Sequence, residues 1–98
     1  MKIKFSDDAK EDIQDISDYT FEVWGQKQEE SYLSSISSKF EDIKANPQKY
    51  RKRDDLFINC QVAPVGRHVI FFSVEGREIL VSRILHHSMD LARQVFPL

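Results

Sequence analysis

The sequence has few of the residues that constrain a chain covalently or conformationally. Its 98 residues include one cysteine, three glycines and three prolines. One cysteine cannot form an internal disulfide, and so little Gly and Pro is not typical of a disordered or low-complexity segment. The longest apolar run, residues 69–72, is far shorter than the roughly 20 residues of a membrane span. We therefore expect one cytoplasmic domain over residues 1–98, with no signal peptide or membrane anchor.

The charges are nearly balanced overall but unevenly distributed. The formal net charge is -2. Residues 1–48 hold six Lys, no Arg and eleven acids, a net of -5, whereas residues 49–98 hold two Lys, six Arg and five acids, a net of +3. Nucleic-acid affinity rests on many Lys and Arg contacts, so a net negative chain predicts no strong direct binding to nucleic acid. The asymmetry is a hint about partners and is compatible with separate binding surfaces on the two halves.

Hydrophobic periodicity predicts two consecutive helices in the first half. Ser6 stands at an N-cap position and is followed by acids that suit the positive end of a helix dipole, so a helix should begin at Asp7. Apolar residues recur at spacings of three and four on both sides of Trp24, and Pro47 ends the second stretch. The short link predicts an antiparallel hairpin with Trp24 packed between the helices and an acidic outer face on the first helix.

Period-two alternation predicts strands in the rest of the chain. A short strand over residues 1–5 should lie at a sheet edge. Three further strands should form an antiparallel meander: residues 58–62, 68–74 and 78–85, with turns at 63–66 and 75–77. The order β-α-α-β-β-β predicts an α+β domain of two layers, a helical hairpin packed on a mainly antiparallel sheet. The other sheet face, where we expect Arg83 among polar neighbours, would then be free to meet a partner.

Short motifs follow one another along nearly the whole chain. They are Trp24-Gly25, Asn46-Pro47, the stretch 53–56, the apolar strand 68–72 and the ending Arg83-Ile84-Leu85-His86-His87-Ser88-Met89-Asp90. Together they resemble the RelE/ParE superfamily of bacterial type II toxins. The ending resembles the ParE branch much more closely than the messenger-cleaving RelE branch.

The resemblance implies a RelE/ParE-like fold and the toxin component of a type II toxin-antitoxin system. Toxins of the ParE branch bind DNA gyrase and interfere with its handling of cleaved DNA, and an antitoxin encoded beside the toxin keeps it inactive. The resemblance therefore implies direct binding, with no chemistry of the toxin's own. The antitoxin's C-terminal segment typically wraps the toxin, with contacts over the hairpin and the sheet.

Two sets of residues are candidates for these two partners. The gyrase set combines cations with the final motif: Arg51, Arg53, Arg67, Arg83, His86, His87, Met89 and Arg93. The antitoxin set consists of large aromatic residues: Trp24, Tyr32, Phe40, Phe57 and Phe71. Other interpretations stay open. The basic stretch 49–53 is also consistent with a solvated loop neutralised by nearby acids. The acidic helix face is consistent with a solubility feature or with a patch for a basic antitoxin segment, and the final motif with a purely structural role.

The main alternative function is cleavage of messenger RNA on the ribosome, as in the RelE branch. Such a site needs general acid-base groups and cations on the phosphate, which the three histidines with Arg67, Arg83 and Arg93 supply. Against it stand the net negative charge and the lack of the C-terminal tyrosine typical of that branch. A second alternative is a non-toxic module that only binds an antitoxin.

The other reactive side chains are predicted to have structural roles. His86 and His87 are adjacent on a strand and should point to opposite faces, and no companion ligand lies at a suitable spacing, so we expect no metal and no cofactor. Cys60 should be a small buried hydrophobe rather than a reactive thiol. Ser88 should cap a last short helix over residues 89–95, whose apolar side chains close the core.

Overall fold

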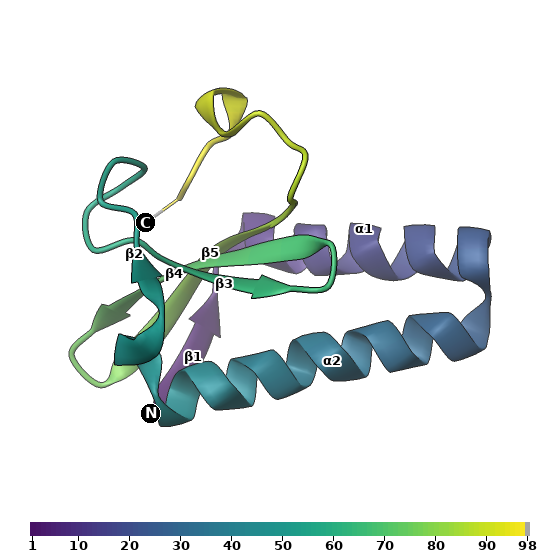
Figure 1. Cartoon of the computed structure of the whole chain (residues 1–98), viewed down its shortest axis with the longest axis horizontal. Coiled ribbons are helices and arrows are strands. Elements are labelled where there is room, and N and C mark those ends of the chain that lie inside the picture. The colour runs from purple at the N-terminus through teal and green to yellow at the C-terminus, as the bar shows by residue number, and fades with distance from the viewer. Residues whose placement is uncertain (98) are drawn as a thin grey trace.

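Two helices lie against one face of a five-stranded sheet (Figure 1). The structure is a computed structural model that describes residues 1–97. Its elements are β1 (Lys2–Phe5), α1 (Asp7–Trp24), α2 (Gln26–Ala45), the 3-10 turn η1 (Pro47–Lys49), β2 (Arg51–Lys52), β3 (Gln61–Val65), β4 (His68–Glu75), β5 (Glu78–His86) and the 3-10 turn η2 (Leu91–Arg93). The predicted α+β class and two-layer arrangement are confirmed.

Helix α1 begins at Asp7, as predicted, because Ser6 caps it. The Ser6 hydroxyl accepts a hydrogen bond from Ala9 N at 2.9 Å and donates one to Ser82 O of β5 at 2.6 Å. One side chain thus starts the helix and fastens it to the sheet.

The hairpin turns at Gly25, whose φ of 89° lies in the region that favours glycine. Trp24 was predicted to pack between the helices, but it is 61% exposed. It lies in the last turn of α1, where the hairpin projects past the sheet and no second layer covers it (Figure 1).

The strand order is β1-β5-β4-β3-β2, with β1 parallel to β5 and the other pairs antiparallel. The edge position of β1 and the central position of β4 agree with the prediction. Strand β2 was not predicted: two residues pair with β3, Arg51 opposite Val62 and Lys52 opposite Gln61. The Gln61 amide supports this pairing by donating to Pro47 O at 2.8 Å and Tyr50 O at 3.1 Å.

The predicted strand over residues 58–62 and turn over residues 63–66 are wrong. Ile58 is 80% exposed in a loop, and the strand is Gln61–Val65. The loop is closed by Asp54 Oδ1, which accepts from Asn59 N at 3.0 Å, while Asn59 has a left-handed φ of 64°. The strand therefore starts later than its alternation indicates, and the chain reverses at Gly66.

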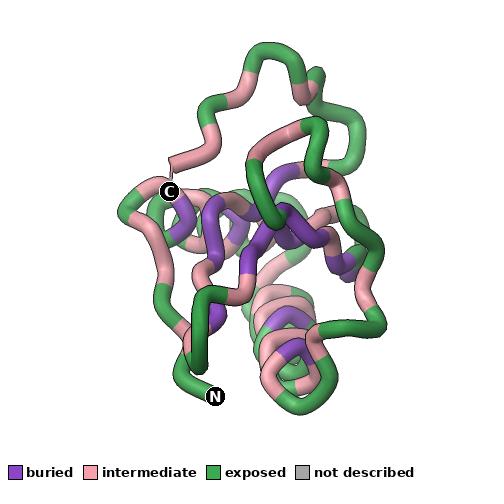
Figure 2. Tube along the Cα trace, turned by 90° about the vertical axis from the view of Figure 1, so that its left-hand side faces the viewer, coloured by how far each residue is buried: buried purple, intermediate pink, exposed green. Residues whose placement is uncertain are grey.

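Buried residues concentrate in the strands and on the helix sides that face them (Figure 2). The core between helices and sheet contains eleven buried residues: Ala9, Ile16, Ile36, Ile43, Ala63, Val65, Ile70, Phe72, Ile79, Val81 and Ile84. Neither helix of the described chain has the length and apolar character to cross a membrane.

The opposite sheet face is not open and polar, contrary to the prediction. It holds a second cluster, Cys60, Phe71 and Leu85, against which Phe57, Leu91 and Phe96 pack from the loop after β2 and from residues 88–97. We call residues 88–97 the strap. The predicted last helix is reduced to η2, and Asp90, not Ser88, caps it by accepting from Ala92 N at 3.1 Å.

Candidate partner-binding surfaces

The first surface is a groove between the end of the hairpin and the β3–β4 turn. Its volume is about 310 Å³, and we call it the hairpin groove. Its lining residues come from both layers: Thr20, Trp24, Gln28, Tyr32, Arg67 and His68. The fold thus places two residues of the antitoxin set, Trp24 and Tyr32, beside Arg67 of the gyrase set.

Tyr32 fixes the inner wall of the hairpin groove. Its hydroxyl accepts from Arg67 N at 3.0 Å and lies 3.2 Å from Val65 O and 2.6 Å from His68 Nδ1. The turn passes so close that a Cβ on Gly66, whose φ is 56°, would lie 2.5 Å from Tyr32 Cε1. The wall is therefore closely packed, and the exposed residues of the groove are Trp24, Gln28 and Arg67.

His68 is held as a neutral ring. Burial, together with the nearby His86 and His87, lowers the pKa of His68 to about 4. At pH 7 the ring is unprotonated and its Nδ1 is engaged by Tyr32. It is therefore poorly suited to donate a proton to a leaving group.

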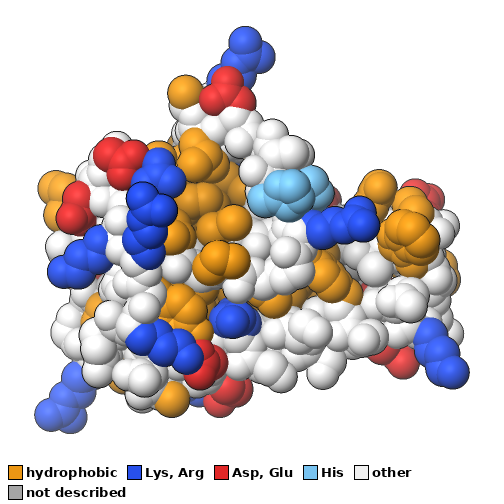
Figure 3. Space-filling view, viewed as in Figure 1, with side chains coloured by type: hydrophobic (Ala, Val, Ile, Leu, Met, Phe, Trp, Pro, Cys, Tyr) orange, Lys and Arg blue, Asp and Glu red, His pale blue; other side chains and the backbone are white. Residues whose placement is uncertain are grey.

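The second surface lies on the strands, beside the strap. This sheet groove has a volume of about 240 Å³ and is lined by Arg53, Val62, Pro64, Val69, Phe71, His86, His87 and Leu91. Figure 3 shows hydrophobic side chains over the strands, with Lys or Arg side chains on one side and His side chains on the other. An apolar floor with a basic rim fits an amphipathic segment that carries acids.

The histidines at the end of β5 stack on each other, contrary to the prediction of opposite faces. The rings of His86 and His87 are 4.5 Å apart at 27°, because the strand ends at His86 and the chain turns. His86 Nδ1 lies 2.7 Å from Ser88 Oγ and accepts from Ser88 N at 3.2 Å. Within residues 1–97, no three His, Cys, Asp or Glu side chains are arranged to hold a metal ion.

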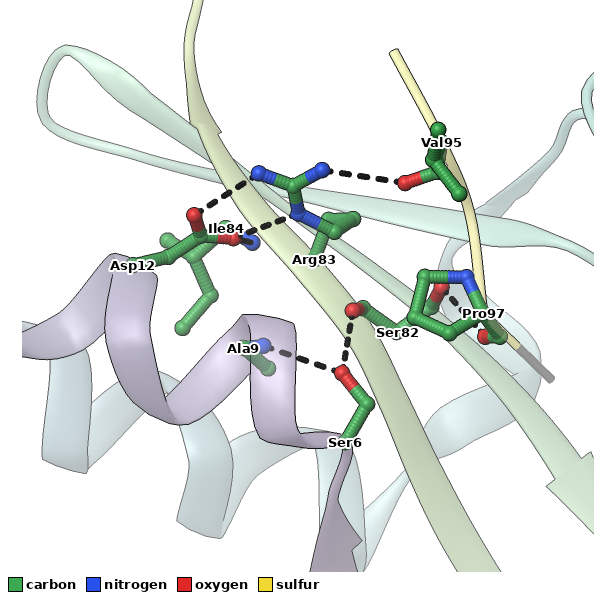
Figure 4. A network of polar contacts seen from close by, with 8 residues as sticks. All are labelled: Ser6, Ala9, Asp12, Ser82, Arg83, Ile84, Val95 and Pro97. Carbon is green, nitrogen blue, oxygen red and sulfur yellow. Dashed lines mark hydrogen bonds and ion pairs between the residues drawn. The ribbon is translucent and has the colours of Figure 1, made fainter.

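Arg83 lies in neither groove, because its guanidinium is taken up by the fold (Figure 4). Nε and Nη2 donate to the two carboxylate oxygens of Asp12 at 2.8 and 2.9 Å, and Nη1 donates to Val95 O of the strap at 3.0 Å. The hydrogen bonds that Arg83 donates to Asp12 raise the pKa of Arg83, and the two side chains are only 16% and 11% exposed. The guanidinium of Arg83 thus joins α1 to the strap.

Asp12 was missed by the sequence reasoning. Its Oδ2 also accepts from Ile84 N at 3.0 Å, so it satisfies the edge of β5 beyond the end of β1. The signal was present: Asp12 stands three residues after Ala9 and four before Ile16, on the apolar stripe of α1. An acid at such a position indicates a buried partner.

The other candidate residues differ in how exposed their side chains are and in whether they are already paired. Arg51, Arg93 and Met89 are exposed, whereas Arg53 forms a two-point ion pair with Asp55 at 2.9 and 2.8 Å. Phe40 packs on Phe5 in the helix-side core, with ring centroids 5.0 Å apart.

The two aromatic candidates on the strand side are covered. Phe57 and Phe71 both lie against Phe96 of the strap, and Phe71 is only 2% exposed. Cys60 is fully buried, as predicted, and burial raises the pKa of its thiol to about 12.

Comparisons with known proteins agree with this geometry. A family model described as the ParE toxin of the type II toxin-antitoxin system parDE matches residues 3–91. Toxin ParE1 of Mycobacterium tuberculosis (strain H37Rv) is 31% identical over 88 residues, covering 89% of this chain and 90% of that protein. Toxin ParE1 of Caulobacter vibrioides is 30% identical over 82 residues, covering 84% of each.

A solved chain described as the chromosomal ParDE TA system from P. aeruginosa superimposes with a TM-score of 0.75. The match covers 88% of this chain and 95% of that one, and at 18% identity it supports the fold alone. The family model and the relatives show that the chain belongs to the ParE family of type II toxin-antitoxin toxins.

Proposed function

We propose that this protein inhibits DNA gyrase in the cytoplasm by binding it directly, and that a cognate antitoxin neutralises it by covering its grooves. Membership of the ParE family carries the proposal. The sheet groove supports it, because an apolar floor with basic side chains at its rim is suited to holding a protein segment.

The exposed cations and strap residues are assigned to gyrase. Arg51, Arg67, His87, Met89 and Arg93 all have solvent-accessible side chains on the strand-rich part of the chain. This part is the basic half, and opposite charges across an interface raise the association rate and fix its orientation.

The aromatic residues are assigned to the antitoxin. Trp24 and Tyr32 line the hairpin groove, where Trp24 offers a large exposed ring beside the closely packed wall. Aromatic side chains in such a position often dominate the binding free energy of an interface. Phe57 and Phe71 are assigned to it as a second aromatic pair, which Phe96 of the strap covers in this structure.

A supercoiling assay with purified gyrase and relaxed plasmid tests the proposal. Micromolar protein should inhibit supercoiling, and an equimolar amount of the small protein encoded beside its gene should restore it. Unchanged gyrase activity in the presence of folded toxin would contradict the proposed inhibition of gyrase. If gyrase stays inhibited after the neighbouring gene product is added, the proposed neutralisation by that protein is contradicted.

The same protein can be tested for the RNA-cleaving alternative. Of the groups that such chemistry would use, His68 is neutral and engaged by Tyr32, and Arg83 is paired with Asp12. These engagements support binding over catalysis. Primer extension on messenger after induction should therefore show no cuts within translated codons.

A further inference from the structure

The strap covers the second apolar cluster with few hydrogen bonds to the strands. Among residues 1–97, no backbone hydrogen bond joins residues 90–97 to a strand. Two side chains of β5 hold residues 90–97 instead: Arg83 Nη1 donates to Val95 O at 3.0 Å, and Ser82 Oγ donates to Pro97 O at 2.7 Å (Figure 4). Both acceptors are strap carbonyls, which water can satisfy equally well once the strap moves.

Phe96 is the aromatic side chain by which the strap contacts the cluster. The Phe96 ring lies 5.1 Å from the ring of Phe71 and 5.5 Å from that of Phe57. Leu91 adds a second apolar contact with the same cluster. Beneath them Phe71 is 2% exposed and Cys60 is fully buried.

We propose that the strap is a releasable cover, which leaves the sheet as a unit while the helices and strands stay folded. Phe96 and Arg83 set the population of the open form. Arg83 is accordingly a positioning residue: it acts on partner binding through the strap, not by contact. The proposal rests on the proposed function in one respect, since the opened face carries Phe57 and Phe71, the aromatic pair assigned to the antitoxin.

Opening the strap should be much easier than unfolding the chain. Release of residues 90–97 breaks two hydrogen bonds to carbonyls and uncovers one small cluster, whereas unfolding disrupts the eleven-residue core between the layers. Segments with few buried contacts open locally at lower free energy than the whole fold does.

Cys60 provides the readout, because it is the only cysteine of the chain and it belongs to the covered cluster. Its burial and its raised pKa make the thiol unreactive while the cover is closed. The rate of modification by a disulfide reagent such as dithionitrobenzoate, measured over a urea series below the unfolding transition, then reports opening. A local opening exposes little surface, so its rate should vary little with urea.

Three variants make the test specific. Phe96→Ala should raise the labelling rate by about 5- to 30-fold. Arg83→Lys should raise it by about fivefold or more, because Lys lacks the planar fork that binds Asp12 and Val95 O together. This second variant leaves every apolar contact of the cluster in place, so a hole beside Cys60 cannot explain its effect. Val95→Ala is the matched control, since that side chain is 69% exposed and its carbonyl is retained; its rate should not change.

The proposal is overturned if Cys60 is labelled only through global unfolding. In that case the free energy from labelling and its urea dependence would equal those from helix circular dichroism, in the wild type and in both strap variants. It is also overturned if Cys60 is labelled at the same rate in Arg83→Lys as in Val95→Ala. The assay uses the toxin alone, so failure to inhibit gyrase or to bind an antitoxin leaves its outcome unaffected.

Discussion

The two faces of the sheet are covered in very different ways. Eleven buried residues form the core between the helices and the sheet, whereas three form the cluster on the strand side, under a loop and the strap. On the helix side, two side chains attach α1 to β5. The Ser6 cap donates to Ser82 O, and the Asp12 carboxylate accepts from Ile84 N. On the strand side, side chains hold an irregular segment by its carbonyls.

This difference indicates a division of labour in a small chain. The closed face supplies most of the hydrophobic stabilisation, because that term scales with the apolar area removed from water. The loosely covered face carries the sheet groove. Regions that must meet partners are drawn from the less stable part of a structure.

The largest expected effect compares one phenylalanine from each face. Phe72→Ala should lower the free energy of unfolding by about 3–5 kcal/mol, because the ring is fully buried. Phe96→Ala should lower the free energy of unfolding by about 1 kcal/mol, because its ring is only partly buried and no further layer of the protein covers it. Urea unfolding followed by helix circular dichroism measures both. Equal losses would remove the distinction between the faces.

The second prediction concerns the ion pair that joins the two regions. Asp12→Ala should cost about 2–3 kcal/mol, because it leaves the Arg83 guanidinium and Ile84 N without their acceptor. Asp12→Asn should cost less, since its amide oxygen can still accept one of these bonds. A loss below about 0.5 kcal/mol for Asp12→Ala in the same urea measurement would contradict this structural role.

The third prediction is a pH dependence that originates at His68. Because the folded-state pKa is lowered to about 4, this group contributes stability above the unfolded value near 6.5, and the contribution is lost as pH falls toward 4. The loss should be about 1–2 kcal/mol, less than the full shift gives because the ring is partly solvated. His68→Asn, whose amide can still bond Tyr32, should lack this part of the decline. Identical unfolding curves against pH for both proteins would refute it.

The smallest effect on stability is expected at the hairpin tip. Trp24→Ala should change the free energy of unfolding by less than about 0.5 kcal/mol, because the ring is 61% exposed. The same change should weaken antitoxin binding about tenfold or more in calorimetry. Phe21→Ala is the matched control, an exposed aromatic of α1 outside the hairpin groove. Similar affinities for the two variants would argue against the groove.

Much of the fold was predictable because local signals and tertiary structure agree. The Ser6 cap, the break at Gly25 and the central strand β4 each depend on residues adjacent in sequence. The prediction for strand β3 is wrong because residues 58–62 alternate apolar and polar side chains, whereas residues 61–65, which form the strand, do not. Its register is decided by pairing of Gln61 with Phe72 and by the left-handed Asn59, neither of which alternation reveals.

The surfaces were less predictable, because they depend on which distant side chains meet. The cation of Arg83 is visible in the sequence, but its engagement by Asp12, 71 residues away, is not. Likewise, the apolar ending of the chain does not reveal that Phe96 lies on Phe71. Trp24 was assigned to the core because an aromatic between two helices usually packs there, and only the projection of the hairpin beyond the sheet exposes it.

Gyrase inhibition by charge-matched double variants tests the central claim most directly. Arg67→Ala with Arg93→Ala removes two exposed cations from the strand-rich half, and Lys10→Ala with Lys27→Ala removes two from the helices. We predict that the first pair raises the toxin concentration needed for half-inhibition of supercoiling by about tenfold or more, and that the second leaves it unchanged. Equal potency of the two folded variants, or a larger loss from the helix pair, would contradict the assignment of gyrase binding to the strand-rich half.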